Sequence, residues 1–232
     1  MPETPVFLIT GASTGIGAAT ARRAVEAGYA VVLAARSAGK LEALAKELGE
    51  DKAIAVPTDV TQFDDQEHVV SHALSRFGRL DVVFANAGFG AKRGFLEETP
   101  EQWRDMVLTN VLGAAYTIRA TLPALRETAE QGHILLTSSV AGRRPLPGSL
   151  YSATKHAVTA MAECLRQELR AAGDRIRVTS IEPGMTDTPF FENPPTNGLE
   201  ADDIARAVLY AVQQPARVDV NEMLIRPTSQ SG

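Results

Sequence analysis

Short apolar runs alternate with helical patterns along almost the whole chain of 232 residues, and this alternation limits the possible folds more than any other feature. Unbroken apolar runs predict strands buried on both faces, which occur in parallel sheets covered by helices. We therefore expect an α/β fold with a doubly wound, seven-stranded parallel sheet and helices on both faces. The expected strands are Val6–Thr10, Ala30–Ala35, Ala53–Pro57, Leu80–Ala85, His133–Thr137, Ile176–Ile181 and Met223–Ile225.

The length predicts one domain, because seven strands and their helices use nearly all of residues 1–232 and leave no room for a separate substrate domain. The least regular segment, at about 185–199, is rich in Pro, Asn, Thr and Gly and contains Phe190 and Phe191. We interpret it as a substrate flap whose aromatic pair covers an apolar ligand. Packing of the pair on the body of the protein is the alternative.

Start and stop signals delimit the helices between the strands. The signals are Gly28 after Ile16–Ala27, Ser37 and Gly49 around the second helix, Thr61 with Asp64 and then Gly78 around the third, and Thr99, Pro100 and Gln102 before a fourth. Pro123 is expected to kink or end that fourth helix.

Charge and cysteine content exclude several partners. With 23 basic and 28 acidic residues, the net charge of −5 offers no long-range attraction to nucleic acid or to an acidic membrane. The single cysteine, Cys164, has no partner for a disulfide within the chain, and four scattered histidines lack metal-ligand spacing. The sequence shows no signal-peptide pattern and no window of 18 apolar residues. We expect a cytoplasmic protein without metal, nucleic-acid or membrane partners.

A glycine-rich segment, Thr10–Gly17, follows the first strand and opens the first helix. Glycines allow close approach to a pyrophosphate, and the N–H groups and dipole of the helix bind an anion. The spacing of Gly11, Gly15 and Gly17 is G-x-x-x-G-x-G, which differs from the broader G-x-G-x-x-G fingerprint, so a plain turn is the alternative. The strand-to-helix context favours a Rossmann-like dinucleotide-binding domain.

The end of the second strand favours NADP over NAD. An NAD site wants an acidic residue there for the ribose hydroxyls, but Ala35 occupies that place. Arg36 follows, and its guanidinium can pair with a 2′-phosphate. The alternative for Arg36 is a solvated charge at the end of a strand.

Tyr151 and Lys155 lie four residues apart on the apolar stripe of a helix over residues 150–171. A buried cation beside a phenol stabilises the phenolate and lowers its pKa from about 10 toward working pH. The pair would then act as a general acid and base in carbonyl/alcohol interconversion. A tyrosine at a helix start beside a snorkelling lysine is the alternative.

Other polar residues fall where strands end, and ligands of parallel sheets bind at that rim. Ser138 or Ser139, after the fifth strand, can donate to a substrate carbonyl oxygen. No histidine is placed to activate either serine as a nucleophile. Asn110 is mildly unfavourable within a helical pattern, which is a weak pointer to function. Asn86–Gly88 and Pro183–Gly184 close two further strands, with turn formation as the alternative.

Together these motifs resemble the short-chain dehydrogenase/reductase family, in its compact single-domain branch, over essentially the whole chain. The motifs are T-G-x-x-x-G-I-G at Thr10–Gly17, Asp59 with Val60, N-A-G at Asn86–Gly88, Asn110 in T-N-V-x-G, S-S-V-A-G at 138–142, Y-x-x-x-K at Tyr151–Lys155 and P-G at Pro183–Gly184.

The resemblance implies that Tyr151 is the acid/base, that Lys155 holds the nicotinamide ribose and lowers the pKa of Tyr151, and that Asn110 supports a proton-relaying water. Ser139 would orient the substrate oxygen. Its spacing to Tyr151 is one residue shorter than the family's commonest spacing, so Ser138 remains the alternative. The implied cofactor contacts are Gly11, Ser13, Thr14, Gly15, Ile16, Gly17, Arg36, Asp59, Val60, Asn86, Ala87, Gly88, Tyr151, Lys155, Pro183, Gly184, Thr186 and Thr188.

The resemblance also implies the activity: NADP(H)-dependent hydride transfer between a small-molecule carbonyl and its alcohol, with NAD the less favoured cofactor, in a homodimer or homotetramer. The tail, residues 214–228, is similar to NADP-dependent members acting on 3-hydroxy acids, serine or clavulanate-type aldehydes. Arg93, Arg143 and Arg144 are candidates for binding a carboxylate, although each is interpreted first as a surface charge. The competing hypothesis is a non-catalytic NADP-binding sensor or scaffold with this fold.

Overall fold

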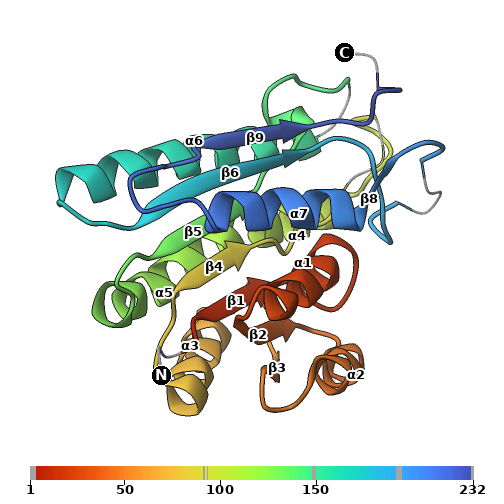
Figure 1. Ribbon diagram of the computed structural model, residues 1–232. Coiled ribbons are helices and arrows are strands. Elements are labelled where there is room, and N and C mark those ends of the chain that lie inside the picture. The colour runs from red at the N-terminus through yellow and green to blue at the C-terminus, as the bar shows by residue number, and fades with distance from the viewer. Residues whose placement is uncertain (1–3, 91, 93, 148–149, 192–194, 231–232) are drawn as a thin grey trace.

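A seven-stranded sheet, parallel throughout, forms the centre of the computed structural model, which describes residues 4–90, 92, 94–147, 150–191 and 195–230 (Figure 1). The strand order is β3-β2-β1-β4-β5-β6-β9, which confirms the predicted fold class. The strands are β1 (Val6–Thr10), β2 (Ala30–Ala35), β3 (Ala53–Pro57), β4 (Val82–Ala85), β5 (His133–Thr137), β6 (Arg177–Pro183) and β9 (Glu222–Ile225). A separate parallel pair consists of β7 (Thr186–Asp187) and β8 (Leu199–Glu200).

The two faces of the sheet have separate hydrophobic cores, as expected when alternate residues of each strand point to opposite faces. Val6 and Leu8 of β1 belong to one core, and Phe7 and Ile9 belong to the other. Helices α1 (Gly15–Glu26), α2 (Ala38–Leu48) and α7 (Ala201–Val212) contribute to the core of Phe7 and Ile9. Helices α3 (Phe63–Phe77), α5 (Ala114–Thr128) and α6 (Leu150–Ala171) contribute to the core of Val6 and Leu8.

Four predicted strands have the observed bounds, and the other three differ at their ends. Strand β6 continues past the predicted end at Ile181 to Pro183, because Glu182 and Pro183 pair with Leu224 and Ile225 of β9. Its extension carries the chain up to Gly184 at the rim of the sheet. Strand β4 begins two residues later than predicted, and β9 begins one residue earlier.

Helix boundaries show which capping signals act. Helix α4 (Pro100–Val107) has the predicted capping box, in which Thr99 and Gln102 each accept a hydrogen bond from the other's backbone N–H. The predicted cap of α3 at Thr61 and Asp64 is wrong: the hydroxyl of Thr61 donates to Asp59 at 2.8 Å instead, and α3 begins after Gln62.

Pro123 lies inside α5, which continues to Thr128, so the expected end of the helix at this proline is wrong, and the alternative, a kink, stays a prediction. A proline removes one helical hydrogen bond. The residues that follow, Ala124 and Leu125, are buried against the sheet and hold the next turn in place.

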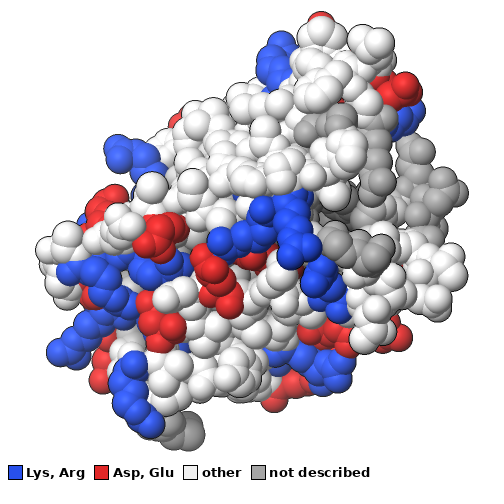
Figure 2. Space-filling model, turned by 90° about the horizontal axis from the view of Figure 1, so that it is seen from above, with Lys and Arg blue, Asp and Glu red and all other residues white. Residues whose placement is uncertain are grey.

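The surface mixes charges of both signs. Figure 2 shows acidic and basic side chains lying among one another on the face seen from above. Within the described part of the chain, no helix is both long and apolar enough to cross a membrane. The same residues contain no group of three or more His, Cys, Asp or Glu placed to hold a metal ion.

His133, at the start of β5, is fully buried. Its Nε2 lies 2.7 Å from the hydroxyl of Thr179, while its Nδ1 has no hydrogen-bond partner in the described structure. Burial, with a smaller effect of the nearby Arg177 cation, lowers the pKa of His133 to about 3.

The unfolded chain therefore binds a proton at this histidine below pH 6.5, and the native protein does not do so until about pH 3. Native stability must fall as the pH is lowered through that window. Between pH 7 and pH 4.5 we expect wild-type protein to lose about 2–3 kcal/mol more than His133→Asn. Urea denaturation at several pH values measures how the free energy of unfolding of each protein depends on pH. An equal pH dependence of the two proteins would contradict the lowered pKa of His133.

Candidate active site

A cavity of about 740 Å³ lies at the carboxyl ends of the central strands. It is lined by the loop after β1, the end of β2 and the loops that follow β3, β4, β5 and β6. All of the predicted site residues line it except Gly17 and Asn110, which are buried. The structure therefore brings together residues that are scattered over most of the sequence.

The ends of β1 and β4 are joined by Thr10 and Asn86. The hydroxyl of Thr10 accepts hydrogen bonds from the backbone N–H groups of Asn86 and Ala87, at 3.0 and 3.1 Å. The side-chain amide of Asn86 donates to the carbonyl of Thr10 at 3.1 Å. The strand order reverses direction between β1 and β4, and loops part at such a position to leave a crevice for a ligand.

The glycine loop lies in this crevice. Gly11 and Gly15 have φ values of 66° and 54°, which favour glycine. A Cβ at Gly17 would lie 2.9 Å from the amide nitrogen of Asn86 and closer still to the carbonyl oxygen of Gly11. Thr14, at the N-cap of α1, makes no side-chain capping bond, and the first turn contains no acidic residue. The positive end of α1 is thus left to bind an anion.

The part of the cavity beside β2 and β3 contains Arg36, Ser37 and Asp59. Arg36 and Ser37 are exposed, and the Ser37 side chain makes no capping bond to α2. One carboxylate oxygen of Asp59 accepts hydrogen bonds from the N–H and hydroxyl of Thr61, which orients the loop after β3. Buried Val60 packs on Gly113, where a Cβ would lie 2.8 Å from its Cγ2.

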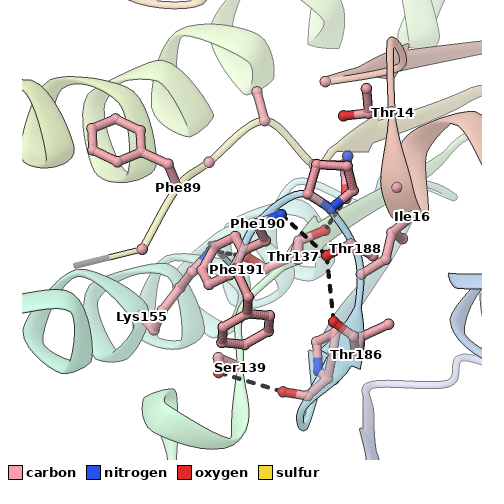
Figure 3. A pocket seen from close by; sticks show the side chains of 18 of the residues that line it. Thr14, Ile16, Phe89, Thr137, Ser139, Lys155, Thr186, Thr188, Phe190 and Phe191 are labelled. Carbon is pink, nitrogen blue, oxygen red and sulfur yellow. Dashed lines mark hydrogen bonds between the residues drawn. The ribbon is translucent and has the colours of Figure 1, made fainter. Parts of the chain in front are cut away.

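At the other end of the cavity, α6 presents Tyr151 and Lys155 from its buried stripe. The Nζ of Lys155 donates to the carbonyl of Thr137 at 2.8 Å and lies 5.6 Å from the centre of the Tyr151 ring. The side chains of Tyr151 and Ser139 are hydrogen-bonded to each other. Figure 3 shows Ser139 and Lys155 in this part of the pocket.

The two serines after β5 have different environments. Ser138 is buried, with its hydroxyl donating to the carbonyl of Lys155 at 2.9 Å and lying 2.7 Å from the hydroxyl of Thr159. Ser139 accepts the N–H of Ala141 and keeps its hydroxyl beside Tyr151. Ser138 therefore anchors α6 to the loop after β5, whereas the hydroxyl of Ser139 lies beside Tyr151 in the cavity.

Asn110 lies within a π-helical segment, Leu108–Gly113, between α4 and α5. Such segments are rare and occur often at functional sites. Its side chain pairs with the backbone of Phe89, accepting from the N–H at 3.0 Å and donating to the carbonyl at 2.9 Å, and it also donates to Thr154. Asn110 thus holds the loop after β4 against α6. The helical pattern of the sequence did not reveal the change of helix type.

Burial dominates the electrostatics of Tyr151 and Lys155. It raises the pKa of Tyr151 to about 12, against a smaller lowering by the hydrogen bond with Ser139. Burial also lowers the pKa of Lys155 to about 8. In the protein alone the pKa of Tyr151 is thus raised, because burial disfavours the phenolate more than the hydrogen bond with Ser139 favours it. A lowering by Lys155 together with a charged nicotinamide ring stays a prediction for the complex with the cofactor.

Residues after β6 cover the cavity, and sequence reasoning missed how they are held. The N–H of Met185 donates to the side-chain oxygen of Gln230 at 2.9 Å, and the hydroxyl of Ser229 donates to the carbonyl of Asn197 at 3.1 Å. Ser229 and Gln230 thus anchor both ends of the expected flap. Residues 192–194 of this flap lie outside the described residues. A tail of Pro, Thr, Ser and Gln carries no pattern that predicts such contacts.

Comparisons with known proteins agree over nearly the whole chain. A family model described as short chain dehydrogenase matches residues 5–197. An uncharacterized oxidoreductase of Staphylococcus haemolyticus is 42% identical over 226 residues, which cover 96% of this chain and 96% of that protein.

Two solved structures are similar to this chain but contain different dinucleotides. An alcohol dehydrogenase from the archaeon Thermococcus sibiricus, complexed with 5-hydroxy-NADP, is 34% identical with a TM-score of 0.91, covering 99% of each chain. A 3-ketoacyl-(acyl-carrier-protein) reductase from Brucella melitensis, complexed with NADH, is 31% identical with a TM-score of 0.86, covering 96% of this chain and 97% of that chain.

The close packing of Gly17 leads to a test of the loop. We expect Gly17→Ala to destabilise the protein by about 1–3 kcal/mol, because the added methyl overlaps Gly11 and Asn86. The matched control is Gly39→Ala in α2, where nothing lies within 4 Å and alanine should stabilise by about 0.5–1 kcal/mol. Urea denaturation compares the variants, and a neutral effect of Gly17→Ala would refute the packing argument.

Proposed function

Because the chain belongs to the short-chain dehydrogenase family, we propose that this oxidoreductase interconverts a carbonyl and an alcohol with NADP(H), using Tyr151 as general acid and base. The observation that supports this proposal most is the composition of one cavity. Its two ends hold the glycine loop and the hydrogen-bonded Tyr151 and Ser139 with Lys155 beside them. The chain forms a single catalytic domain in this proposal, with residues 185–199 as its flap.

The residues at the glycine loop fit a dinucleotide. Gly11, Gly15 and Gly17 allow the loop to pack closely on Asn86, Ala87 and Thr188, and the uncapped first turn of α1 beside it would bind a pyrophosphate. When bound, the nicotinamide ring donates or accepts the hydride. Thr186 and Thr188 also line the cavity, and Thr188 packs on this loop, with its Cβ 3.2 Å from the position of a Cβ at Gly15.

NADP is the proposed cofactor and NAD the less favoured one. The buried Ala35 offers no carboxylate to the ribose hydroxyls, and exposed Arg36 and Ser37 line the same part of the cavity. A guanidinium and a hydroxyl suit a 2′-phosphate, because both donate hydrogen bonds to an anion.

The protonation states favour proton donation at neutral pH. With a pKa of about 12, Tyr151 keeps its proton and can donate it to a developing alkoxide. Ser139, hydrogen-bonded to Tyr151, is placed to orient the same oxygen. Lys155, with a pKa of about 8, is mostly protonated at pH 7 and would hold ribose hydroxyls while favouring negative charge on the phenol.

Removal of the phenol hydroxyl should abolish turnover without loss of cofactor binding. We expect Tyr151→Phe to reduce kcat by at least about 100-fold, the scale of one general acid/base, while the NADPH dissociation constant changes less than about threefold. NADPH oxidation with a panel of aldehydes and ketones measures the first quantity, and fluorescence titration measures the second. The control is Tyr210→Phe, which alters an exposed tyrosine of α7 that does not line the cavity.

Near wild-type turnover in Tyr151→Phe would remove the tyrosine from its proposed role. NADPH binding without consumption by wild-type protein across the whole panel would instead support a non-catalytic sensor or scaffold.

Arg36 should decide between the two dinucleotides. Loss of a charge-assisted hydrogen bond is worth about 1.5–3 kcal/mol, so we expect Arg36→Ala to weaken NADPH binding roughly tenfold to hundredfold and NADH binding less than about twofold. Calorimetric titration of both dinucleotides provides the measurement, with the exposed Arg104→Ala on α4 as the matched control. An equal loss for both dinucleotides would show that Arg36 does not read the 2′-phosphate.

A further inference from the structure

The segment after β6 is fixed at its ends and carries two aromatic rings between them. Strands β7 and β8 pair through Thr186 with Leu199 and Asp187 with Glu200, which joins the two ends of the segment. The hydroxyl of Thr188 accepts the N–H of Phe190 at 3.4 Å. Figure 3 shows Phe190 and Phe191 extending from this anchored turn into the pocket that contains Ser139 and Lys155.

Phe190 contacts both walls of the cavity. Its ring packs edge-on against Tyr151, with centroids 5.7 Å apart and planes at 63°, and against Phe191 at 5.0 Å. On the opposite wall a Cβ at Gly90 would lie 2.7 Å from Cε1 and Cζ of this ring. The absence of a side chain at Gly90 thus provides the space in which Phe190 lies beside the proposed acid.

Phe190 nevertheless remains 39% exposed, although a ring of this size gains free energy from burial. An apolar molecule between Phe190 and Tyr151 would cover both rings. Beside the polar Ser139, Tyr151, Lys155 and Gln230, several other side chains at this end are apolar. They include Phe89, Val140, Leu146, Met185 and Phe191.

Charges near this end are already engaged. The guanidinium of Arg143 donates to both carboxylate oxygens of the buried Glu182, at 2.7 and 2.8 Å, and also pairs with Glu222. Arg144 does not line the cavity, and the Nζ of Lys155 donates to Thr137. Arg93 lies outside the described residues. Among the described residues that line this end, Lys155 is the cation, and the proposed function assigns it to the ribose of the cofactor, so a substrate carboxylate would have to compete with the cofactor for it.

We infer that Phe190 is the specificity-determining residue of this site and that the substrate is an uncharged, apolar carbonyl compound or the corresponding alcohol. The inference rests on the proposed function and narrows it. The inferred substrate class differs from the one that the resemblance of the tail implies, which is acidic substrates such as 3-hydroxy acids and serine. An unpaired carboxylate would lose its hydration against Phe190 and Leu146 without a compensating partner.

The test compares benzaldehyde with 4-carboxybenzaldehyde, which carries an additional charged carboxylate at the para position, with NADPH as the reductant. We expect wild-type protein to prefer benzaldehyde by roughly 100-fold or more in kcat/KM, since an unpaired buried charge is disfavoured. Phe190→Ala should lower kcat/KM for benzaldehyde by roughly tenfold, chiefly because KM rises. It should also reduce the preference for benzaldehyde over 4-carboxybenzaldehyde. Phe190→Leu should restore most of the loss because it retains apolar area.

Two further variants isolate the cause. Gly90→Ala should reproduce the effect of Phe190→Ala, because the added methyl displaces the ring from outside the flap. Phe95→Ala is the matched control: Phe95 is 60% exposed, packs on Trp103 and does not line the cavity. None of these variants should change the NADPH dissociation constant, which fluorescence titration measures.

A preference for 4-carboxybenzaldehyde, or turnover of L-serine or 3-hydroxybutanoate that Arg93→Ala abolishes, would overturn the inference. Phe190→Ala with unchanged KM and preference would also overturn it.

If wild-type protein reduces no carbonyl compound, the proposed function fails and the inference is decided by binding. Calorimetric titration of the complex with NADP⁺ then compares benzyl alcohol with 4-carboxybenzyl alcohol. Tighter binding of the neutral ligand supports an apolar site, and equal or weaker binding refutes it.

Discussion

Three hydrogen bonds between Thr10 and the segment Asn86–Ala87 hold the ends of β1 and β4 together, and the site depends on this junction. The chain leaves β1 toward the face of α1, and it leaves β4 toward the face of α5. The two loops must separate, yet the strands beneath them must stay in register. Gly17 then allows α1 to approach the junction closely, so the position of the anion-binding helix end is set by the same few atoms.

Patterns that arise from local physics were predictable, whereas choices between neighbouring side chains were not. Fully buried strands, the glycine loop and the stripe through Tyr151 and Lys155 follow from periodicity and turn chemistry. Sequence alone left Ser138 and Ser139 as alternatives, because only the packed positions of Thr159 and Lys155 show which hydroxyl turns inward. Thr61 was misassigned as a cap because Asp59, two residues earlier, competes for its hydroxyl.

One physical effect, removal from water, acts in opposite directions on acids and bases in this protein. It raises the pKa of the Tyr151 phenol and lowers the pKa values of Lys155 and His133. Each group is thereby biased toward its neutral form, which the composition of the chain could not predict. Glu182 is also buried, and Arg143 and Ser180 both donate hydrogen bonds to its carboxylate. In the proposed reaction, the low polarity around Tyr151 would strengthen its hydrogen bond with the reacting oxygen.

The hydrogen bonds of Ser229 and Gln230 join the flap to residues that are synthesised after it. Gln230 holds Met185 from 45 positions downstream, and Ser229 holds Asn197 from 32 positions downstream. A nascent chain emerges from the ribosome in sequence order, so the glycine loop, the α6 stripe and the flap itself are all present before their last anchor is synthesised. The contacts of Met185 with Gln230 and of Asn197 with Ser229 can therefore form only after the chain beyond β9 has been synthesised.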